Sequence, residues 1–435
     1  MKPINVGLLG VGTVGGGTYN VLKRNREEIA RRAGREIQIR MVASRTKESI
    51  KKLVGDSVEI VEPEVLVAHP DIDIVVELIG GHTIAKTLVL KAIANGKHVV
   101  TANKALLALH GNEIFMAAQK QGVMVAFEGA VAGGVPIIKA LREGLTANRI
   151  EWIAGIINGT SNFILSEMRD KGTSFGDALK EAQKRGYAEA DPTFDVEGID
   201  AAHKLTIMSA IAFGIPMQFE KAYTEGISRL ASEDIRYAEE MGYRIKLLGI
   251  TRRAANGIEL RVHPTLIPKR RLIANVEGVM NAILVMGDAV GATLYYGAGA
   301  GADPTASAVV ADLVDVTRMH TADPENRVPH LAFQPDQVRD VPILPIEEVE
   351  TSYYLRLRAA DKPGVLADVA RILADQDISI DAMIQKEAPE GEDATDIIML
   401  THRTLEKRIN TAIAKIESLP TIQGKIVRLR MEELN

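Results

Sequence analysis

Short apolar runs alternate with helical stretches over the first 145 residues of the chain. Five of these runs predict buried strands, at residues 4–9, 37–43, 72–78, 98–101 and 123–127. Between them the spacing of apolar residues predicts helices, among them 84–95 and 112–121. Strands that alternate with helices in this way are typical of a parallel sheet covered on both faces.

Paired strands replace this alternation in the middle of the chain. Two apolar runs are joined around Asn256-Gly257, a pair that is typical of a tight hairpin turn. Strands are expected here at 150–157, 246–253, 258–264, 282–286 and 292–296, and a closing helix at 304–317. The pattern predicts a second, α+β domain over residues 146–318.

A proline-rich stretch precedes the last part of the chain. Residues 319–350 contain five of the 17 prolines and little periodicity, which indicates a linker. Residues 351–435 then read as strand, helix, strand, strand, helix, strand, at 352–359, 364–375, 378–385, 395–401, 405–419 and 424–430. This order is typical of a small ferredoxin-like domain. The predicted fold class is therefore α/β, with a Rossmann-type domain at 1–145, the α+β domain and this C-terminal domain.

Composition excludes several classes of function. The 435 residues hold 52 Lys plus Arg against 57 Asp plus Glu, and aromatic residues make up only 4%. A net charge of -5 argues against a nucleic-acid partner, because such proteins usually carry a basic excess. The best apolar stretch, 205–217, is too short for a membrane span. The chain has no cysteine, which excludes disulfides and thiolate catalysis, and we expect a cytoplasmic protein.

A glycine-rich turn follows the first predicted strand and fits the pattern G-x-G-x-x-G. The motif consists of Gly10, Val11, Gly12, Thr13, Val14 and Gly15. The first glycine of such a motif makes a tight turn, the second lets the backbone approach a pyrophosphate, and the third lets helix and strand pack closely. The start of the helix then faces the phosphates. The turn predicts a dinucleotide site, and a bare turn is the alternative.

Two basic positions lie where a dinucleotide would end. Arg45 follows the second predicted strand, at the place where an acid would bind a ribose 2′-hydroxyl, and so favours the 2′-phosphate of NADP over NAD. A solvated basic turn is the alternative, and NAD stays possible. Lys104 follows the strand at 98–101, at the carboxyl edge where ligands bind. An exposed turn lysine is its alternative interpretation.

The densest polar cluster lies at residues 186–204. Asp200 and Lys204 are four residues apart on a predicted helix and therefore share one face. A surface ion pair is the simplest interpretation. The following residues, 205–213, are apolar nearly all round, so the helix is expected to be buried and the pair to face a cleft. His203 is expected to be structural, or a surface residue, rather than catalytic.

This cluster resembles the homoserine dehydrogenase family at that family's spacing. The matching positions are Ala182, Gly186-Tyr187-Ala188, Asp191-Pro192, Asp195-Val196, Gly198, Asp200 and Lys204. The segment Asn158-Gly159-Thr160-Ser161-Asn162 and the N-terminal glycine turn are similar to the same family. Residues 361–366 resemble the opening of an ACT domain, an amino-acid-sensing module. The resemblance covers essentially the whole chain.

The resemblance implies oxidation of L-homoserine to L-aspartate 4-semialdehyde and its reverse, in threonine and methionine biosynthesis. It implies that Lys204 moves the proton at the reacting oxygen and that Glu189 and Asp200 bind homoserine. It also implies that the cofactor is contacted by Lys104, Gly186 and Gly301. The domain at 146–318 would then bind substrate, catalyse and dimerise.

The family also implies a cation, an effector and an oligomer. A monovalent cation, usually Na+, would take oxygens from Glu128, Val131, Gly133 and Val135. L-Threonine is the implied effector of the ACT domain, near 361–366 and 378–384, and a module kept only for dimerisation is the alternative. We expect a homodimer or homotetramer.

Two other functions stay open. A Rossmann dehydrogenase for another small amino or hydroxy acid would share the glycine turn. A non-enzymatic sensor of cofactor and amino acid would share the first and last domains, but the cluster of acids and Lys204 argues against it. An assay of L-homoserine turnover distinguishes a homoserine dehydrogenase from these two alternatives.

Overall fold

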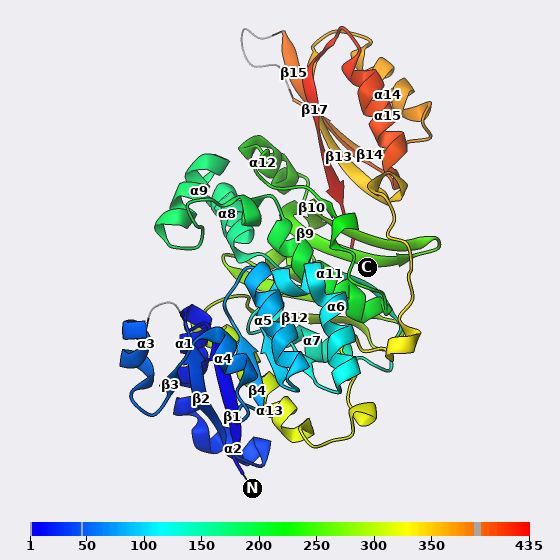
Figure 1. Cartoon of the computed structure of the whole chain (residues 1–435). Helices are drawn as coiled ribbons and strands as arrows, with labels where there is room; N and C mark the ends of the chain where they lie inside the picture. Colours follow the sequence, from blue (N-terminus) through cyan, green and yellow to red (C-terminus); the bar gives the residue numbers. More distant parts are fainter. Residues whose placement is uncertain (1, 45–46, 387–392) are drawn as a thin grey trace. The chain divides into compact units, whose positions relative to one another are not determined.

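The computed structural model describes residues 2–44, 47–386 and 393–435, and the chain folds into two compact units (Figure 1). The first unit consists of Met1–Gly159, Asp200–Ala222 and Val279–Val341. The second consists of Thr160–Ile199, Tyr223–Gly278 and Pro342–Asn435. The boundaries expected from the sequence at 145, 318 and 350 stay predictions.

A six-stranded parallel sheet forms the core of the first unit. Its order is β3-β2-β1-β4-β5-β6. The strands are β1 (Ile4–Leu9), β2 (Ile37–Ala43), β3 (Glu59–Ile60), β4 (Ile74–Glu77), β5 (His98–Thr101) and β6 (Val125–Ala126). The chain leaves β1 for β2 on one side and returns to β4 on the other. Ligands of open α/β sheets bind at the carboxyl ends of the strands where the order reverses in this way.

Helices cover this sheet, and one of them comes from far along the chain. They are α1 (Thr13–Arg24), α2 (Arg26–Ala33), α3 (Lys47–Val54), α4 (Pro63–Ala68), α5 (Thr83–Ala94), α6 (Lys104–Gln121) and α13 (Ala302–Met319). Val309 and Leu313 of α13 share a buried core with Val6 and Leu8 of β1. The start of α13 approaches α1 closely, since a Cβ on Gly17 would lie 2.6 Å from the carbonyl oxygen of the first residue of α13.

The rest of the first unit is antiparallel and helical. The strand β11 (Met280–Gly287) pairs with both β7 (Ile150–Ile156) and β12 (Gly291–Ala298). Two short helical turns, α7 (Ile137–Lys139) and a π-turn at Ala140–Gly144, precede β7. The helix α11 (Ile199–Phe213) is buried from its second residue to its last. This burial explains why its sequence is apolar on nearly every side.

The second unit is built on a mixed, mainly antiparallel sheet that includes the C-terminal domain. The strands follow the order β9-β10-β17-β13-β15-β14. Their bounds are β8 (Tyr223–Thr224), β9 (Tyr243–Ala254), β10 (Gly257–Pro268), β13 (Glu350–Ala360), β14 (Ile380–Gln385), β15 (Ala394–Thr401), β16 (Thr404–Leu405) and β17 (Ile422–Met431). The last strand, β17, pairs with β10 in parallel at Thr265↔Arg430. The C-terminal sheet is therefore continuous with the predicted hairpin.

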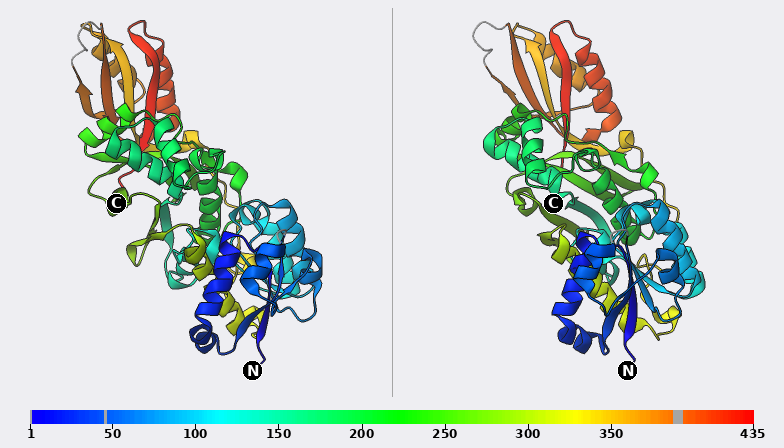
Figure 2. Two further views of the ribbon diagram at one scale, coloured as in Figure 1. Left: turned by 90° about the vertical axis from the view of Figure 1, so that its left-hand side faces the viewer. Right: turned by 60° about the vertical axis from the view of Figure 1, so that its left-hand side comes forward.

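Helices of the second unit divide into two groups. Those before the C-terminal domain are α8 (Gly159–Lys171), α9 (Phe175–Lys184), α10 (Thr193–Val196) and α12 (Ser232–Glu240). Within that domain, α14 (Val365–Ala374) and α15 (Glu406–Glu417) lie side by side on one face of the sheet (Figures 1 and 2). Alternate residues of β13 face these helices, among them Tyr353, Leu355 and Leu357.

The fold class predicted from the sequence is confirmed, as an N-terminal parallel sheet, a mixed sheet and a βαββαβ domain. The hairpin around Asn256-Gly257 is also confirmed, with Ala254 opposite Gly257. The proline-rich stretch contains short 3-10 turns, at Pro324–Asn326, Pro335–Gln337 and Ile346–Glu348, and an isolated β-bridge from Ile343 to Ile258. In the described ranges, no helix combines the length and the apolar character that crossing a membrane requires.

Candidate active site

The glycine turn after β1 leaves the start of α1 open to a ligand. Gly10 has a left-handed backbone (φ +88°), and a Cβ there would lie 2.6 Å from the carbonyl oxygen of Leu78. A Cβ on Gly15 would lie 2.1 Å from the carbonyl oxygen of Gly10, so both positions require glycine. Gly12 differs, because no atom of the described residues, apart from its own chain neighbours, lies within 4 Å of the place of its Cβ. That open space lets a pyrophosphate reach the backbone.

The remaining residues of the motif complete this opening. Val11 precedes Gly12, which is the N-cap of α1, and Thr13 and Val14 are the first two residues of the helix. The first turn of α1 carries no acidic side chain. The helix dipole and the backbone N–H groups therefore favour a phosphate there, with no carboxylate to repel it.

Buried hydrogen bonds join the carboxyl ends of β4 and β5 at the same edge of the sheet. Glu77 ends β4, is fully buried, and accepts from Thr101 Oγ1 at 2.7 Å and from the N–H of Ile79 at 2.9 Å. Asn103 caps α6 with its side-chain oxygen and donates to a carbonyl of the loop after β4 at 2.6 Å. Lys104 is the first residue of α6, so this cap fixes its backbone at the ligand edge.

Lys204 and Asp200 lie one turn apart on α11 and form a short ion pair. Lys204 Nζ donates to Asp200 Oδ2 at 2.6 Å and to the carbonyl oxygen of Ile157 at 2.8 Å. Asn158 Nδ2 donates to the same carboxylate oxygen at 2.9 Å. Lys104 Nζ lies 3.0 Å from the other oxygen, Asp200 Oδ1. The carboxylate of Asp200 is thus held between two lysines.

The two lysines differ in burial. Lys204 is 8% exposed and Asp200 3%, whereas the side chain of Lys104 is 35% exposed. Burial alone would raise the pKa of Asp200, but the charges of Lys204 and Lys104, with the hydrogen bonds from Lys204 and Asn158, hold that pKa well below its usual value. Asp200 is therefore an anion at neutral pH. An ammonium held by an anion in a largely water-free place can donate a proton to a reacting oxygen.

His203 lies beside this pair but is turned to other neighbours. Its ring centroid lies 4.2 Å from that of Phe219, and the residue is 4% exposed. Burial lowers the pKa of His203 to about 4, against a smaller raising effect of Asp200. A neutral ring packed on an aromatic side chain fits the structural role expected from the sequence.

The turn expected to hold a cation is buried and tightly packed. Val131, Gly133 and Val135 are buried, and a Cβ on Gly133 (φ +49°) would lie 2.6 Å from the carbonyl oxygen of Gly299. The carboxylate of Glu128 accepts from two backbone N–H groups of α7, at 2.9 and 2.8 Å. In the part of the chain that the structure describes, no three His, Cys, Asp or Glu side chains gather as a metal site. A cation at this turn would therefore depend mainly on backbone oxygens.

Four other residues were expected from the sequence to contact the cofactor or the substrate. Gly301 is the N-cap of α13 in the first unit, with φ +124°. Gly186 and Glu189 lie in the second unit, where both are exposed and the carbonyl oxygen of Glu189 accepts from the side chain of Gln183 at 3.1 Å. Arg45 lies outside the described residues. The roles of all four toward cofactor and substrate stay predictions.

Two polar residues of the site had no role assigned from the sequence. Asn158 belongs to a quoted motif, but its hydrogen bond to Asp200 joins residues 42 positions apart. Glu77 ends a buried strand, where an acid is unusual, and that position was the available signal. Desolvation raises the pKa of Glu77, while hydrogen bonds from Thr101, Ile79 and Asn103 oppose the rise.

A parallel sheet with an open glycine turn and a buried lysine–carboxylate pair defines a dinucleotide-dependent oxidoreductase. Comparison with family models refines the class. The homoserine dehydrogenase model matches residues 136–314, the NAD-binding domain of homoserine dehydrogenase matches 10–128, and the ACT domain matches 353–421. A homoserine dehydrogenase of Pseudomonas aeruginosa is 65% identical over 100% of both chains. The chain therefore belongs to the homoserine dehydrogenase family and is an oxidoreductase.

Solved structures agree with this assignment. A homoserine dehydrogenase from Thiobacillus denitrificans is 73% identical, with a TM-score of 0.96 over 100% of this chain and 99% of that chain. A hyperthermophilic archaeal homoserine dehydrogenase in complex with NADPH is 26% identical, with a TM-score of 0.62 over 73% of this chain and 98% of that chain. The NAD-binding domain and this relative support a nicotinamide cofactor for the chain.

Proposed function

We propose that the chain transfers hydride reversibly between L-homoserine and NADP+, with Lys204 as the residue that moves the proton. The observation that carries this proposal is the contact of 2.6 Å between Lys204 Nζ and Asp200 Oδ2 on a buried helix. The nicotinamide supplies hydride acceptance and donation when bound. What the protein must add is a proton donor and acceptor at the substrate oxygen.

Lys204 performs that step at its Nζ atom. When the aldehyde is reduced, the new alkoxide takes a proton from the Lys204 ammonium, and when homoserine is oxidised, neutral Lys204 takes the hydroxyl proton. Asp200 orients the ammonium and stabilises its charge, and Asn158 holds the carboxylate of Asp200. The carbonyl oxygen of Ile157 accepts a second hydrogen bond from the ammonium, which helps to hold Nζ in place.

The remaining residues bind the two reactants. Glu189 and Asp200 bind homoserine, and Lys104 lies on the nicotinamide and substrate side, where its partly exposed ammonium attracts a carboxylate. Gly186 and Gly301 let backbone approach the cofactor. The left-handed conformation of both glycines supports this role, because a side chain at either position would be strained.

NADP is the proposed cofactor, and NAD is the alternative. The open space above Gly12 and the uncharged first turn of α1 fit a pyrophosphate. Arg45 carries the preference for the 2′-phosphate.

A monovalent cation, Na+, is proposed at the turn formed by Glu128, Val131, Gly133 and Val135. Hard cations prefer oxygen ligands, and the turn can supply backbone oxygens beside a buried carboxylate. Its function there is to fix the turn that packs against the loop before α13.

We propose L-threonine as a feedback inhibitor that binds the ACT domain near 361–366 and 378–384. The loop before α14 carries exposed Asp361 and left-handed Gly364, a turn in which backbone N–H groups can receive a carboxylate. Deleting the domain would be a poor test, because β17 pairs with β10 and Glu432 accepts from fully buried Arg261 at 2.5 Å. Asp361→Ala should instead weaken inhibition and leave the uninhibited rate unchanged.

A homodimer or homotetramer is the proposed assembly. The strand β12 ends the order β12-β11-β7 and is half-exposed along its length, with Tyr296 59% exposed. Light scattering on the purified protein measures the assembly directly.

Initial rates of L-homoserine oxidation test the function. The assay uses NADP+ or NAD+, each with and without L-threonine, and glycerate and malate as control substrates. Reduced cofactor should form with homoserine only, faster with NADP+, and threonine should slow it. Turnover of a control substrate at the same rate would contradict the assignment of L-homoserine as the substrate. No turnover at all would favour the non-enzymatic sensor instead.

A further inference from the structure

A hollow of about 580 Å³ in the second unit is lined by three arginines from three elements. Arg169 comes from α8, Arg236 from α12 and Arg244 from β9. None of them belongs to the active site described above. A hollow of this size is within the range that small-molecule ligands occupy in proteins.

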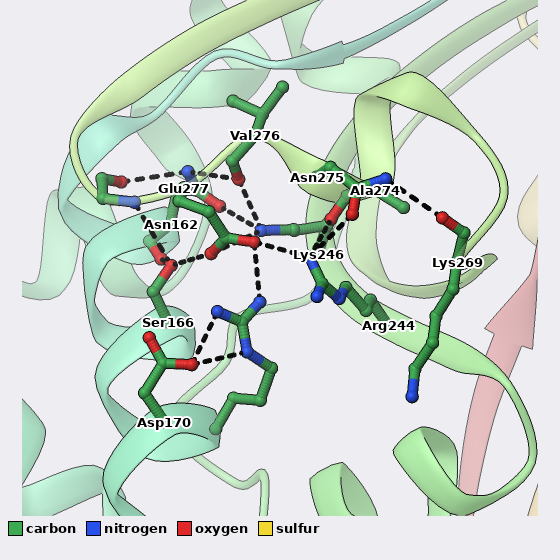
Figure 3. Close-up of polar contacts among 12 residues, drawn as sticks. Asn162, Ser166, Asp170, Arg244, Lys246, Lys269, Ala274, Asn275, Val276 and Glu277 are labelled. Carbon is green, nitrogen blue, oxygen red and sulfur yellow. Dashed lines mark hydrogen bonds and ion pairs between the residues drawn. The ribbon is translucent and has the colours of Figure 1, made fainter.

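Two of these arginines converge on one carboxylate beside the hollow. The Nη1 atoms of Arg169 and Arg244 both lie 2.7 Å from Glu277 Oε1 (Figure 3). Asp170 accepts from Arg169 Nε and Nη2, at 2.8 and 2.7 Å. Lys246 is buried beside them, with Nζ 3.7 Å from Glu277 Oε2. The acids therefore hold the arginines in a fixed arrangement before any ligand arrives.

Positive charge exceeds negative charge in this group, which we call the arginine cluster. It consists of Arg169, Arg236, Arg244, Lys246, Lys269, Asp170, Glu239 and Glu277. The negative charge of Glu239 is already balanced by Lys269, whose Nζ lies 2.7 Å from Glu239 Oε2. Three arginines line the hollow itself against the two carboxylates of Asp170 and Glu239, which leaves one positive charge at its wall. An anion would neutralise this charge.

Polar groups at the wall of the hollow lack hydrogen bonds. Arg244 Nε and Glu239 Oε1 are buried and 3.4 Å apart, yet neither has a hydrogen-bond partner among the described residues. Buried polar atoms of this kind usually bind water or a ligand. Arg236 adds an exposed guanidinium whose central carbon lies 5.2 Å from the centre of the Tyr237 ring. Arg236 thus offers N–H donors at the wall of the hollow.

We propose that the arginine cluster binds a phosphate group, carried by a small phosphorylated metabolite or free in solution. The planar fork of a guanidinium matches phosphate oxygens two at a time, and Arg236 is the arginine of the hollow that forms no ion pair with an acid among the described residues. Met168 and Ile235 line the same hollow and supply an apolar surface for the carbon part of a metabolite.

The position of α12 connects this site to the C-terminal domain. Asp234 of α12 is fully buried and accepts from Arg356 Nε at 2.6 Å and from the hydroxyl of Tyr354 at 2.9 Å, both on β13. Arg236 lies two residues further along the same helix. A ligand bound by Arg236 therefore acts on the helix that is clamped to the sheet of the ACT domain.

Calorimetric titration of the full-length protein tests the site. NADP+ is kept saturating so that the glycine turn of α1 is occupied, and the titrants are inorganic phosphate and O-phospho-L-serine at constant ionic strength. We expect saturable binding that weakens with added salt. Tighter binding of O-phospho-L-serine assigns the site to a phosphorylated metabolite, and equal binding per phosphate group assigns it to free phosphate.

Variants separate the arginine cluster from other phosphate sites. Arg236→Ala should weaken binding about tenfold, Arg236→Lys should weaken it less, and Arg371→Ala, at an exposed position of α14, should not change it. The unfolding midpoint of each variant shows that the exposed substitutions leave the fold intact. Unchanged binding by Arg236→Ala, absence of saturable heat, or equally tight binding of succinate would overturn the proposal. None of these results bears on homoserine turnover.

Discussion

Lys204 Nζ lies 2.6 Å from Asp200 Oδ2, one turn away on the buried helix α11. The carboxylate of Asp200 also accepts a hydrogen bond from Asn158 and forms an ion pair with Lys104. Three side chains from three segments of the chain therefore hold this carboxylate in place. The proton transfer that we propose for Lys204 therefore depends on the geometry of a single helical turn.

Homoserine oxidation should accelerate as pH rises. Lys204 must be neutral to take the hydroxyl proton, a free lysine has a pKa of about 10.4, and the neighbouring Asp200 carboxylate favours the charged form. The rate of oxidation should therefore rise from pH 7 toward pH 10, while aldehyde reduction should not need that rise. Asp200→Asn should shift the rising limb to lower pH by at least about one unit. A flat profile in the wild type would remove Lys204 from the role of base.

Asn158→Ala should slow the reaction without loosening the cofactor. The substitution removes a hydrogen bond to a charged carboxylate, which is worth about 1.5–3 kcal/mol, so kcat should fall roughly tenfold or more. Because Asn158 acts by positioning Asp200, the pH profile of oxidation should move as well. Asn95→Ala, at the C-cap of α5, is the matched control and should behave as the wild type. An unchanged pH profile would assign Asn158 a merely structural role.

The glycine turn allows cofactor binding to be separated from folding. Gly12→Ala places a methyl group in open space, so the unfolding midpoint should not change, but the Kd for NADP+ should rise at least tenfold because the methyl group occupies the path of the pyrophosphate. Gly15→Ala places its Cβ 2.1 Å from the carbonyl oxygen of Gly10, so it should lower the unfolding midpoint. Fluorescence titration and thermal unfolding measure the two effects. Wild-type affinity in Gly12→Ala would contradict the placement of the cofactor.

Asp312 should make the protein less stable as pH rises. Burial raises the pKa of Asp312 to about 7, helped by Glu128 and opposed by Lys139. Since the folded pKa lies above the unfolded value of about 3.9, the contribution of the protonated group to stability is complete below about pH 4 and is lost as pH rises through 7. Asp312→Asn cannot ionise and should keep roughly 2–4 kcal/mol more stability at pH 8 than the wild type does, relative to pH 4.

Urea unfolding between pH 4 and pH 8 measures this difference. The asparagine side chain can still accept from the N–H of Glu128, which donates to Asp312 at 2.7 Å in the wild type. Asp336→Asn, at an exposed position, is the control. Parallel pH curves for the wild type and Asp312→Asn would show that Asp312 does not carry the effect.

Much of the fold could be predicted because the signals are local. The strand at 98–101 and the pair Asp200 and Lys204 each lie within one element, where periodicity and spacing decide the outcome. The bounds of the helix α12 could not be predicted, since its sequence is mostly polar. It is fixed by the buried Asp234, whose partners on β13 are 120 and 122 residues away.

The candidate site divides in the same way. The glycine turn and Lys104 could be placed from local sequence, because the strands that precede them end at the sheet edge. The hydrogen bond from Asn158 to Asp200 and the burial of Glu77 depend on segments that meet only in the folded chain. Contacts of that kind leave no periodic pattern in a single sequence.

The central claim is that Lys204 moves the proton at the reacting oxygen, and Lys204→Ala tests it most directly. The measurement is the rate of NADPH formation from L-homoserine at pH 9, together with the Kd for NADP+ of the same preparation. Turnover should fall at least about a hundredfold while the Kd stays within a factor of two or so, and Lys91→Ala, at an exposed position of α5, should retain wild-type turnover. Wild-type turnover in Lys204→Ala would contradict the account.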